Sequence, residues 1–273
     1  MRRYRGDVDD RPAAACAHML RRSLGAPDDA GDADAEHLVE AVGVDAVDRR
    51  IFGPHRIVDD DVDAAEVGRG AVERLMQRVA IGDVAAERDA LHEAFDSAAA
   101  DLGGIDIVVN NAMWTKYSPI DGIDAESLDK MLGVGIAGII WGTQAAAKHM
   151  RTRGGGSIVN IASVSAHMGL PNAMVYCGIK AAVEGMTRSS AIELAPSAIR
   201  VNAVAPSTVA TEGVRAMLDD ATFAARVAST PLGRLGETSD IAEAVLFFAD
   251  STRSGFVTGQ SLLVDGGISI ALR

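Results

Sequence analysis

GSIVNIASVSAHMGLPNAMVYCGIK, residues 156–180, is the segment from which the architecture of this chain can be worked out. Its apolar start, residues 157–161, predicts a short buried strand, and Ser163 follows that strand in a loop. The next part predicts a helix that carries Tyr176 and Lys180. Because these two residues are four apart, a helix places them on one face, one turn from each other.

A phenol beside an ammonium group is a pair that can move a proton. The positive charge of Lys180 is expected to favour the phenolate of Tyr176 and to lower its pKa from the usual value of about 10. Tyr176 would then exchange a proton near neutral pH. A nearby serine hydroxyl can hold a carbonyl or alcohol oxygen, so we predict Ser163, Tyr176 and Lys180 as the catalytic residues.

These residues resemble the active-site region of the classical short-chain dehydrogenase/reductase family, in which a serine precedes a Tyr-x-x-x-Lys motif by thirteen residues. The resemblance covers about residues 79–270 and includes five separate motifs in the order of the family. It implies an α/β fold, with a doubly wound, Rossmann-like parallel sheet and helices on both faces. It also implies hydride transfer between NAD or NADP and an alcohol or carbonyl carbon, with Tyr176 as general acid and base.

The resemblance also implies which residues contact the cofactor. VAIGDV at 79–84 predicts a strand that ends beside the adenine ring, and IDIVV at 105–109 predicts a buried strand that leads into the turn 110–113. IRVNAVAP at 199–206 predicts a strand before a loop that closes over the nicotinamide. The implied cofactor contacts are Asp83, Val84, Asn110, Ala112, Tyr176, Lys180, Pro206, Val209 and Thr211.

Two positions depart from the family pattern near this site. Met113 replaces a glycine, which is expected either to crowd the nicotinamide pocket or to be absorbed by a shift of the loop. Gly135 replaces an asparagine that, in the resembled family, contributes to a proton relay through water towards the lysine. That member of the relay is missing here.

Residues 1–78 depart further, because they lack the Thr-Gly-x-x-x-Gly-x-Gly turn that brings a helix N-terminus to a pyrophosphate. Two interpretations remain open: a diverged cofactor half, or an unrelated segment, which the missing glycines favour. Residues 55–58 predict a strand that ends in the acids 59–61, and an acid there would bind ribose hydroxyls, which gives a weak preference for NAD. A solvated charge run is the competing interpretation. We expect residues 1–78 and the catalytic region 79–273 to form one domain.

Composition limits the classes of partner that this chain can be expected to bind. At 273 residues the chain suits one large α/β domain, and its net charge of -12 argues against a nucleic-acid partner. Cys16 and Cys177 are far apart, so we expect neither a disulfide framework nor a metal site. The two cysteines also favour a reducing, cytoplasmic location. Because no segment approaches ~18 uncharged apolar residues, we expect no membrane partner. The resemblance implies a homodimer or homotetramer that acts on a small alcohol or ketone.

The other segments predict helices around the sheet and a final strand. Helices are expected at 87–100, at 125–150 and at 240–248, the last capped by Thr238 or Ser239, and a strand at 261–264. Residues 212–230 lie where the resembled proteins carry a mobile substrate lid, and their methionine, leucine and phenylalanine indicate an apolar cover.

Two further functions stay open beside the oxidoreductase. One is a protein with the shell of the family and no catalysis, which the missing glycine turn, Gly135 and Met113 favour. The other is a nucleotide-binding regulator, which the intact Ser-Tyr-Lys set argues against. The sequence does not identify the substrate.

Overall fold

The computed structural model describes residues 44–46, 88–211, 214–215 and 218–271. The strands expected at 55–58 and 79–84 lie outside these residues, as do the cofactor contacts Asp83 and Val84.

The described strands form one sheet in the order β1-β2-β3-β4-β5. Neighbouring strands from β2 to β5 run parallel, as expected, but β1 pairs antiparallel with β2. The strand bounds are Val44–Ala46 for β1, Ile107–Asn110 for β2, Gly156–Ile161 for β3, Ile199–Pro206 for β4 and Ser261–Val264 for β5.

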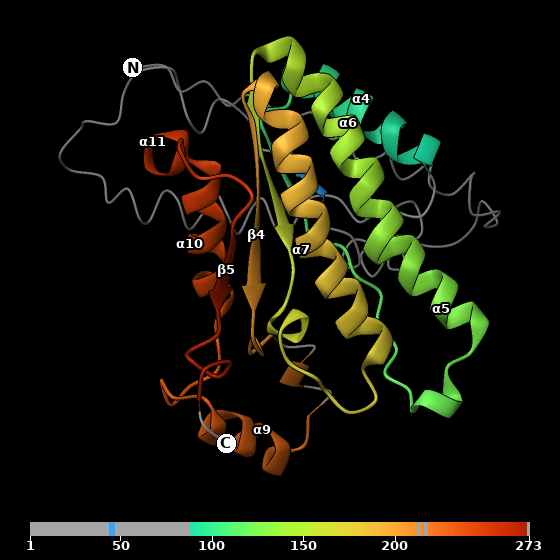
Figure 1. The fold of residues 1–273 in the computed structure, drawn as a ribbon, viewed down its shortest axis with the longest axis vertical. Helices are drawn as coiled ribbons and strands as arrows, with labels where there is room; N and C mark the ends of the chain where they lie inside the picture. The colour runs from blue at the N-terminus through green and yellow to red at the C-terminus, as the bar shows by residue number, and fades with distance from the viewer. Residues whose placement is uncertain (1–43, 47–87, 212–213, 216–217, 272–273) are drawn as a thin grey trace, which may run out of the picture.

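Helices cover both faces of the sheet (Figure 1). On one face lie α4 (Arg88–Leu102), α6 (Gly138–Arg153) and α7 (Met174–Leu194), and on the other lie α10 (Thr238–Ala249) and α11 (Ser251–Ser254). β4 shows why the sheet accepts both layers. Its residues Val201 and Ala203 pack under the first layer, whereas Val204 packs with Phe248 of α10. Side chains alternate between the faces of a strand, so an almost wholly apolar strand has to be covered twice.

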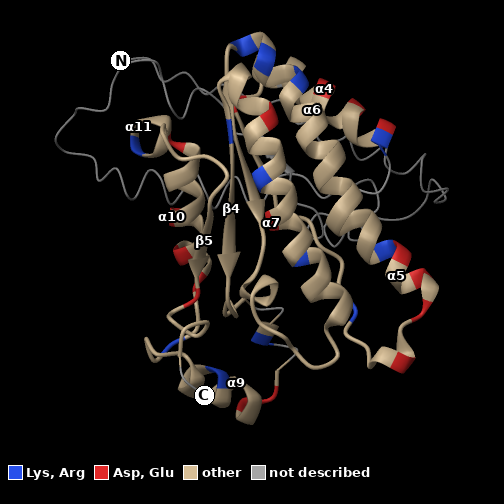
Figure 2. Ribbon diagram, in the orientation of Figure 1, with Lys and Arg blue, Asp and Glu red and all other residues tan. Residues whose placement is uncertain are grey.

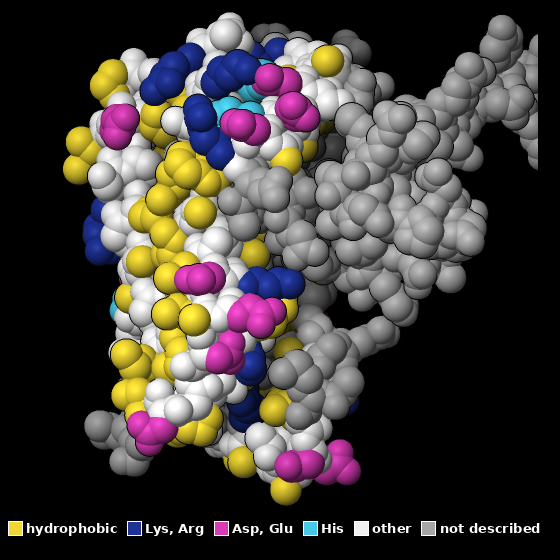
Figure 3. Space-filling view, turned by 90° about the vertical axis from the view of Figure 1, so that its right-hand side faces the viewer, with side chains coloured by type: hydrophobic (Ala, Val, Ile, Leu, Met, Phe, Trp, Pro, Cys, Tyr) yellow, Lys and Arg dark blue, Asp and Glu magenta, His cyan; other side chains and the backbone are white. Residues whose placement is uncertain are grey.

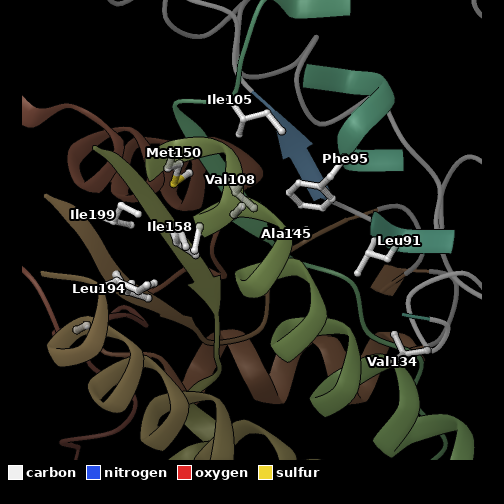
Figure 4. Packing of buried hydrophobic residues seen from close by; sticks show 14 residues of the cluster. Leu91, Phe95, Ile105, Val108, Val134, Ala145, Met150, Ile158, Leu194 and Ile199 are labelled. Carbon is white, nitrogen blue, oxygen red and sulfur yellow. The ribbon is translucent and has the colours of Figure 1, made fainter. Parts of the chain in front are cut away.

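The largest core cluster lies between the sheet and α4, α6 and α7 (Figure 4). Leu91 and Phe95 of α4 belong to this cluster, which confirms the apolar stripe expected on that helix. Asp96 ties α4 to α6, because Lys148 Nζ and His149 Nε2 lie 2.6 and 2.8 Å from its Oδ1. Trp141 of α6 also packs against the cluster.

The single helix expected at 125–150 is interrupted. α5 (Ala125–Leu132) begins at Asp124, whose side chain accepts a hydrogen bond from Ser127 N. A π-helical turn, η4 (Gly133–Ala137), then separates α5 from α6. Glycines at 133, 135 and 138 weaken the local preference for a regular α-helix, and such insertions recur at functional sites.

Short elements and caps complete the described chain. The cap of α10 is Glu237, not Thr238 or Ser239, because Glu237 and Asp240 form a reciprocal capping box. α9 (Asp220–Ser229) occupies part of the expected lid and begins at the cap Asp219. Three 3-10 turns are η3 (Ile120–Gly122), η5 (Val164–Ala166) and η6 (Ala195–Ser197). Among the described residues, no helix has the length and apolarity that crossing a membrane requires.

Candidate active site

The parallel strands bring most of the predicted site residues to one edge of the sheet. β2 ends at Asn110, β3 ends two residues before Ser163, and β4 ends at Pro206. Figure 1 shows β3 and β4 pointing towards the end of the molecule where α9 lies. Ligands of parallel α/β sheets bind at the carboxyl ends of the strands, so this edge is the candidate site.

Ser163 is held at the start of the turn η5. Its backbone is extended, with φ -167° and ψ 155°, and its Oγ accepts a hydrogen bond of 3.1 Å from Ser165 N. The same hydroxyl lies 3.5 Å from the carbonyl oxygen of Pro206 and hydrogen-bonds the Tyr176 side chain. Ser163 therefore connects the ends of β3 and β4 to the phenol on α7.

Lys180 is buried, with 4% of its surface exposed. Its Nζ donates a hydrogen bond of 2.7 Å to the carbonyl oxygen of Ile161, the last residue of β3. Burial lowers the pKa of Lys180 to about 8, because the charged form loses its hydration. The ammonium group lies 5.8 Å from the centre of the Tyr176 ring. The serine, tyrosine and lysine thus converge as the sequence predicted.

The prediction for the pKa of Tyr176 was wrong in direction. Burial raises it above the usual value of 10, and the hydrogen bond from Ser163 offsets part of that increase. Lys180 Nζ donates a hydrogen bond to the Ile161 carbonyl oxygen. Its ammonium group therefore faces this carbonyl and the ring of Tyr176. The phenol is therefore neutral at pH 7 in the protein without ligand, and it can donate a proton.

Tyr117 is a neighbour of the site that the sequence did not reveal. Its ring meets the Tyr176 ring edge-on, with 5.7 Å between ring centres and an angle of 77°. Half of its surface is exposed. Tyr117 lies in the irregular segment between β2 and η3, where neither a period nor a motif marks a functional residue.

Asn110 braces the sheet beneath the site. Its Nδ2 donates to Asn160 Oδ1 at 2.8 Å, and Asn160 Nδ2 donates to Thr187 Oγ1 at 2.9 Å. This buried network joins β2, β3 and α7. The polar Asn160 inside the apolar strand GSIVNI was the signal that sequence reasoning missed. Asn110 Oδ1 is buried without a hydrogen-bond partner in the described part of the chain.

The loop after β4 is also held firmly. Val209 forms a bridge with Gly236, and Ala210 N donates to Gly236 O at 2.8 Å. Thr211 Oγ1 accepts a hydrogen bond of 3.2 Å from Val214 N. Ala112, on the loop after β2, packs against the main core cluster.

The donors at this edge fit the ribose and carboxamide end of a nicotinamide cofactor. Hydroxyl groups of Ser163, Tyr176 and Thr211 and the ammonium group of Lys180 are supplied by β3, α7 and the loop after β4. Hydroxyls and amides are the groups that such donors bind. The adenine contacts Asp83 and Val84 lie outside the described residues, so this fit concerns the nicotinamide end alone.

The two departures from the family pattern touch each other. A Cβ placed on Gly135 would lie 2.7 Å from Ile179 Cγ2 and 2.9 Å from Met113 Sδ. Met113 therefore fills the space in front of Gly135, at the π-helical turn and beside the residue that precedes Lys180.

The chain is similar to known proteins over most of its length. The family described as enoyl-(acyl carrier protein) reductase matches residues 57–269. Gluconate 5-dehydrogenase of Gluconobacter oxydans is 33% identical over 214 residues, covering 78% of this chain and 82% of the relative. The inactive 2-(S)-hydroxypropyl-CoM dehydrogenase 2 of Xanthobacter autotrophicus is 35% identical over 211 residues, covering 76% and 88%.

A solved structure is similar as well. The crystal structure of a gluconate 5-dehydrogenase from Burkholderia cenocepacia in complex with NADP and tartrate superposes with a TM-score of 0.66 and 35% identity. The similarity covers 69% of this chain and 74% of that one. The family match begins at residue 57. It therefore includes the end of the strand expected at 55–58 and the acids at 59–61.

Proposed function

The chain belongs to the classical short-chain dehydrogenase/reductase family of NAD(P)-dependent oxidoreductases, and we propose that Tyr176 is its general acid and base. The reaction is a hydride transfer between the nicotinamide cofactor and an alcohol or carbonyl carbon. The convergence of Ser163, Tyr176 and Lys180 at the carboxyl edge of the sheet carries this proposal.

Each residue has a separate task. Tyr176 holds a proton on its phenolic oxygen and passes it to, or takes it from, the substrate oxygen. Ser163, fixed by Ser165 N, orients that oxygen by a hydrogen bond. Lys180 is anchored by Ile161 and keeps two N–H donors for the ribose of the cofactor. The bound cofactor supplies or accepts the hydride.

The cofactor contacts proposed for the rest of the site are Asp83, Val84, Asn110, Ala112, Pro206, Val209 and Thr211. The earlier preference for NAD has no support, because the solved gluconate 5-dehydrogenase binds NADP. NAD and NADP are therefore both candidate cofactors. We further propose that residues 1–78 belong to the same domain as 79–273, since the family match begins at residue 57.

The exposed apolar side chains support a homo-oligomer. Figure 3 shows hydrophobic side chains in a band down the side of the molecule that carries α5 and α6. Ile140 of α6 is 43% exposed and Ile192 of α7 is 79% exposed. Contiguous apolar surface of this kind marks association sites. A homodimer or homotetramer in the cytoplasm remains the expectation.

A protein without catalysis is the second candidate. The side chain of Met113 fills the space beside Gly135 where the resembled family places an asparagine. An inactive relative of similar identity shows that this degree of likeness does not guarantee turnover.

Cofactor titration separates the two candidates. The purified protein is titrated with NADH and NADPH while cofactor fluorescence and thermal unfolding are followed. Saturable binding with a raised unfolding midpoint is expected of the enzyme, because a ligand of the folded state stabilises it by mass action. A cooperatively folded protein that binds neither cofactor contradicts the proposal.

Tyr176→Phe then tests the catalytic role with a panel of alcohols and ketones. Turnover is expected to fall about 10²–10⁴-fold while cofactor binding and the unfolding midpoint persist. Ser190→Ala removes another hydroxyl from α7, one that donates to Met186 O at 2.7 Å, and serves as the control. Retained turnover in Tyr176→Phe would remove Tyr176 from the mechanism.

A further inference from the structure

Arg226 of α9 reaches back to the loop that borders the site. Its Nη1 donates a hydrogen bond of 2.8 Å to Thr208 Oγ1. Thr208 lies between Pro206 and Val209, and its carbonyl oxygen accepts a 3.1 Å hydrogen bond from Gly236 N, so it is a fixed point. Figure 1 places α9 beyond the end of β4, at the edge of the sheet where the candidate site lies.

Tyr117 links this arginine to the catalytic phenol. Its ring packs edge-on against Tyr176 at 5.7 Å. Burial raises the pKa of Tyr117, and the positive charge of Arg226 acts in the opposite direction on the same phenol. Tyr117 therefore contacts Tyr176 and lies within electrostatic reach of Arg226, although the three residues come from separate segments.

Arg226 has charge and donors left over. Arg153, Arg234 and Arg253 each pair with an aspartate, whereas Arg226 makes no ion pair within the described residues. One hydrogen bond to Thr208 leaves most of its five N–H donors unused. Arg226 is exposed and also borders an open groove with Pro231 and Ile268, so a ligand has room beside it. Asp219, the acid at the start of α9, is occupied in capping Thr222.

We propose that Arg226 binds a carboxylate of the substrate, so that the alcohol or ketone handled by Tyr176 is a hydroxy acid or an oxo acid. A planar guanidinium fork matches a carboxylate with two parallel hydrogen bonds. Thr208 holds the fork in place on the loop that follows Pro206. This inference rests on the proposed oxidoreductase function and adds the substrate class to it.

Arg215 is a second guanidinium in the described part of the lid. Its guanidinium stacks on the Phe223 ring of α9, with 4.8 Å to the ring centre. The predicted lid is therefore not a purely apolar cover. It carries two guanidinium groups in a chain whose net charge is -12, and Figure 2 shows basic residues on this part of the ribbon.

Binding of matched acid and alcohol probes tests the proposal without turnover. L-Malate and butane-1,2,4-triol share a four-carbon chain. The two carboxylates of malate are replaced by hydroxymethyl groups in the triol. At constant ionic strength and saturating NADP⁺ or NAD⁺, malate is expected to raise the unfolding midpoint and the triol is not. Arg226→Met should weaken malate binding about tenfold or more, and Arg226→Lys should weaken it less. Arg253→Met, which removes the same charge from α11, is the control.

Turnover separates this inference from the function on which it rests. The full chain is assayed with L-malate against butane-1,2,4-triol and with L-lactate against propane-1,2-diol. A preference for the acids that Arg226→Met removes, with the rates on the triol and the diol unchanged, supports the proposal. Malate binding that requires Arg226 without any turnover would preserve the anion site and reject the proposed activity.

Two outcomes overturn the inference: equal binding of malate and the triol, and malate binding that survives Arg226→Met. If malate binding survives while that variant loses NADP⁺ affinity, Arg226 serves a cofactor phosphate.

Discussion

The Gly135→Ala variant tests whether the π-helical turn is packed as tightly as the structure shows. The added Cβ would lie 2.7 Å from Ile179 Cγ2 and 2.9 Å from Met113 Sδ. Both distances are well inside the ordinary separation of nonbonded atoms. Met113 can rotate away, but Ile179 is 2% exposed and branched at Cβ, so it has little freedom to yield.

Two opposing effects set the magnitude. Glycine in a helix costs about 1 kcal/mol against alanine, so an uncrowded Gly135→Ala would stabilise the protein by up to that amount. Overpacking a filled site typically costs about 1–3 kcal/mol, and we expect a cost in this range for Gly135→Ala. Gly178 of α7 gives the matched comparison, because it is exposed and a Cβ there would meet nothing within 4 Å. Gly178→Ala is expected to be the more stable variant by about 1–3 kcal/mol.

Urea unfolding of the two variants and the wild type measures this difference. A shift of about 2–4 °C in the thermal midpoint per kcal/mol provides a second readout for a chain of this size. Met113→Ala combined with Gly135→Ala should recover part of the loss, with a coupling energy of at least about 0.5 kcal/mol. If Gly135→Ala is as stable as Gly178→Ala, the packing argument is refuted.

Three further predictions concern buried or paired groups. Burial depresses the pKa of Lys180 to about 8 while the unfolded chain keeps the proton up to 10.5; the wild type should therefore gain stability between about pH 8 and 10, and Lys180→Met should not, as urea midpoints will show. Arg153→Ala should cost about 1–3 kcal/mol, because the guanidinium bonds both Asp106 oxygens at 2.8 and 3.2 Å; a loss below about 0.5 kcal/mol in urea unfolding would contradict this. Glu184 Oε1 lies 2.8 Å from His167 Nε2 and accepts a hydrogen bond of 2.7 Å from Ser261 Oγ. Glu184→Ala should therefore lower the free energy of unfolding by about 2 kcal/mol in urea, and Glu184→Gln should lower it less. Equal losses in the two variants would contradict the hydrogen-bond explanation.

The regular elements could be predicted because their signal is local. The strands at 199–206 and 261–264 have the predicted bounds, and α4 starts and ends within two residues of the prediction. A wholly apolar run bounded by polar turns leaves few alternatives in an α/β chain. The positions of Ser163, Tyr176 and Lys180 followed from the order of these elements, since carboxyl ends of parallel strands share an edge.

The remaining features depend on contacts between distant segments. The pKa of Tyr176 follows from burial and from the direction of the Lys180 side chain, and four-residue spacing describes neither. Arg226 stands in a segment without a motif, and only the fold brings it to Thr208. The direction of β1 likewise depends on pairing with β2 across a long stretch of chain. Sequence periodicity reports which face of an element is apolar, not which partner covers it.

Met113 and Gly135 show how such a contact changes an argument from sequence. Taken one at a time, each is the loss of a family residue, a glycine in one place and an asparagine in the other. In the structure the methionine sulfur occupies the space that a side chain at 135 would need, so packing couples the two positions. Gly135→Asn alone would press on both Met113 and Ile179 and would not rebuild a relay. Even where Met113 rotates away or is replaced by glycine, the Ile179 methyl, 2.7 Å from the new Cβ, has to move.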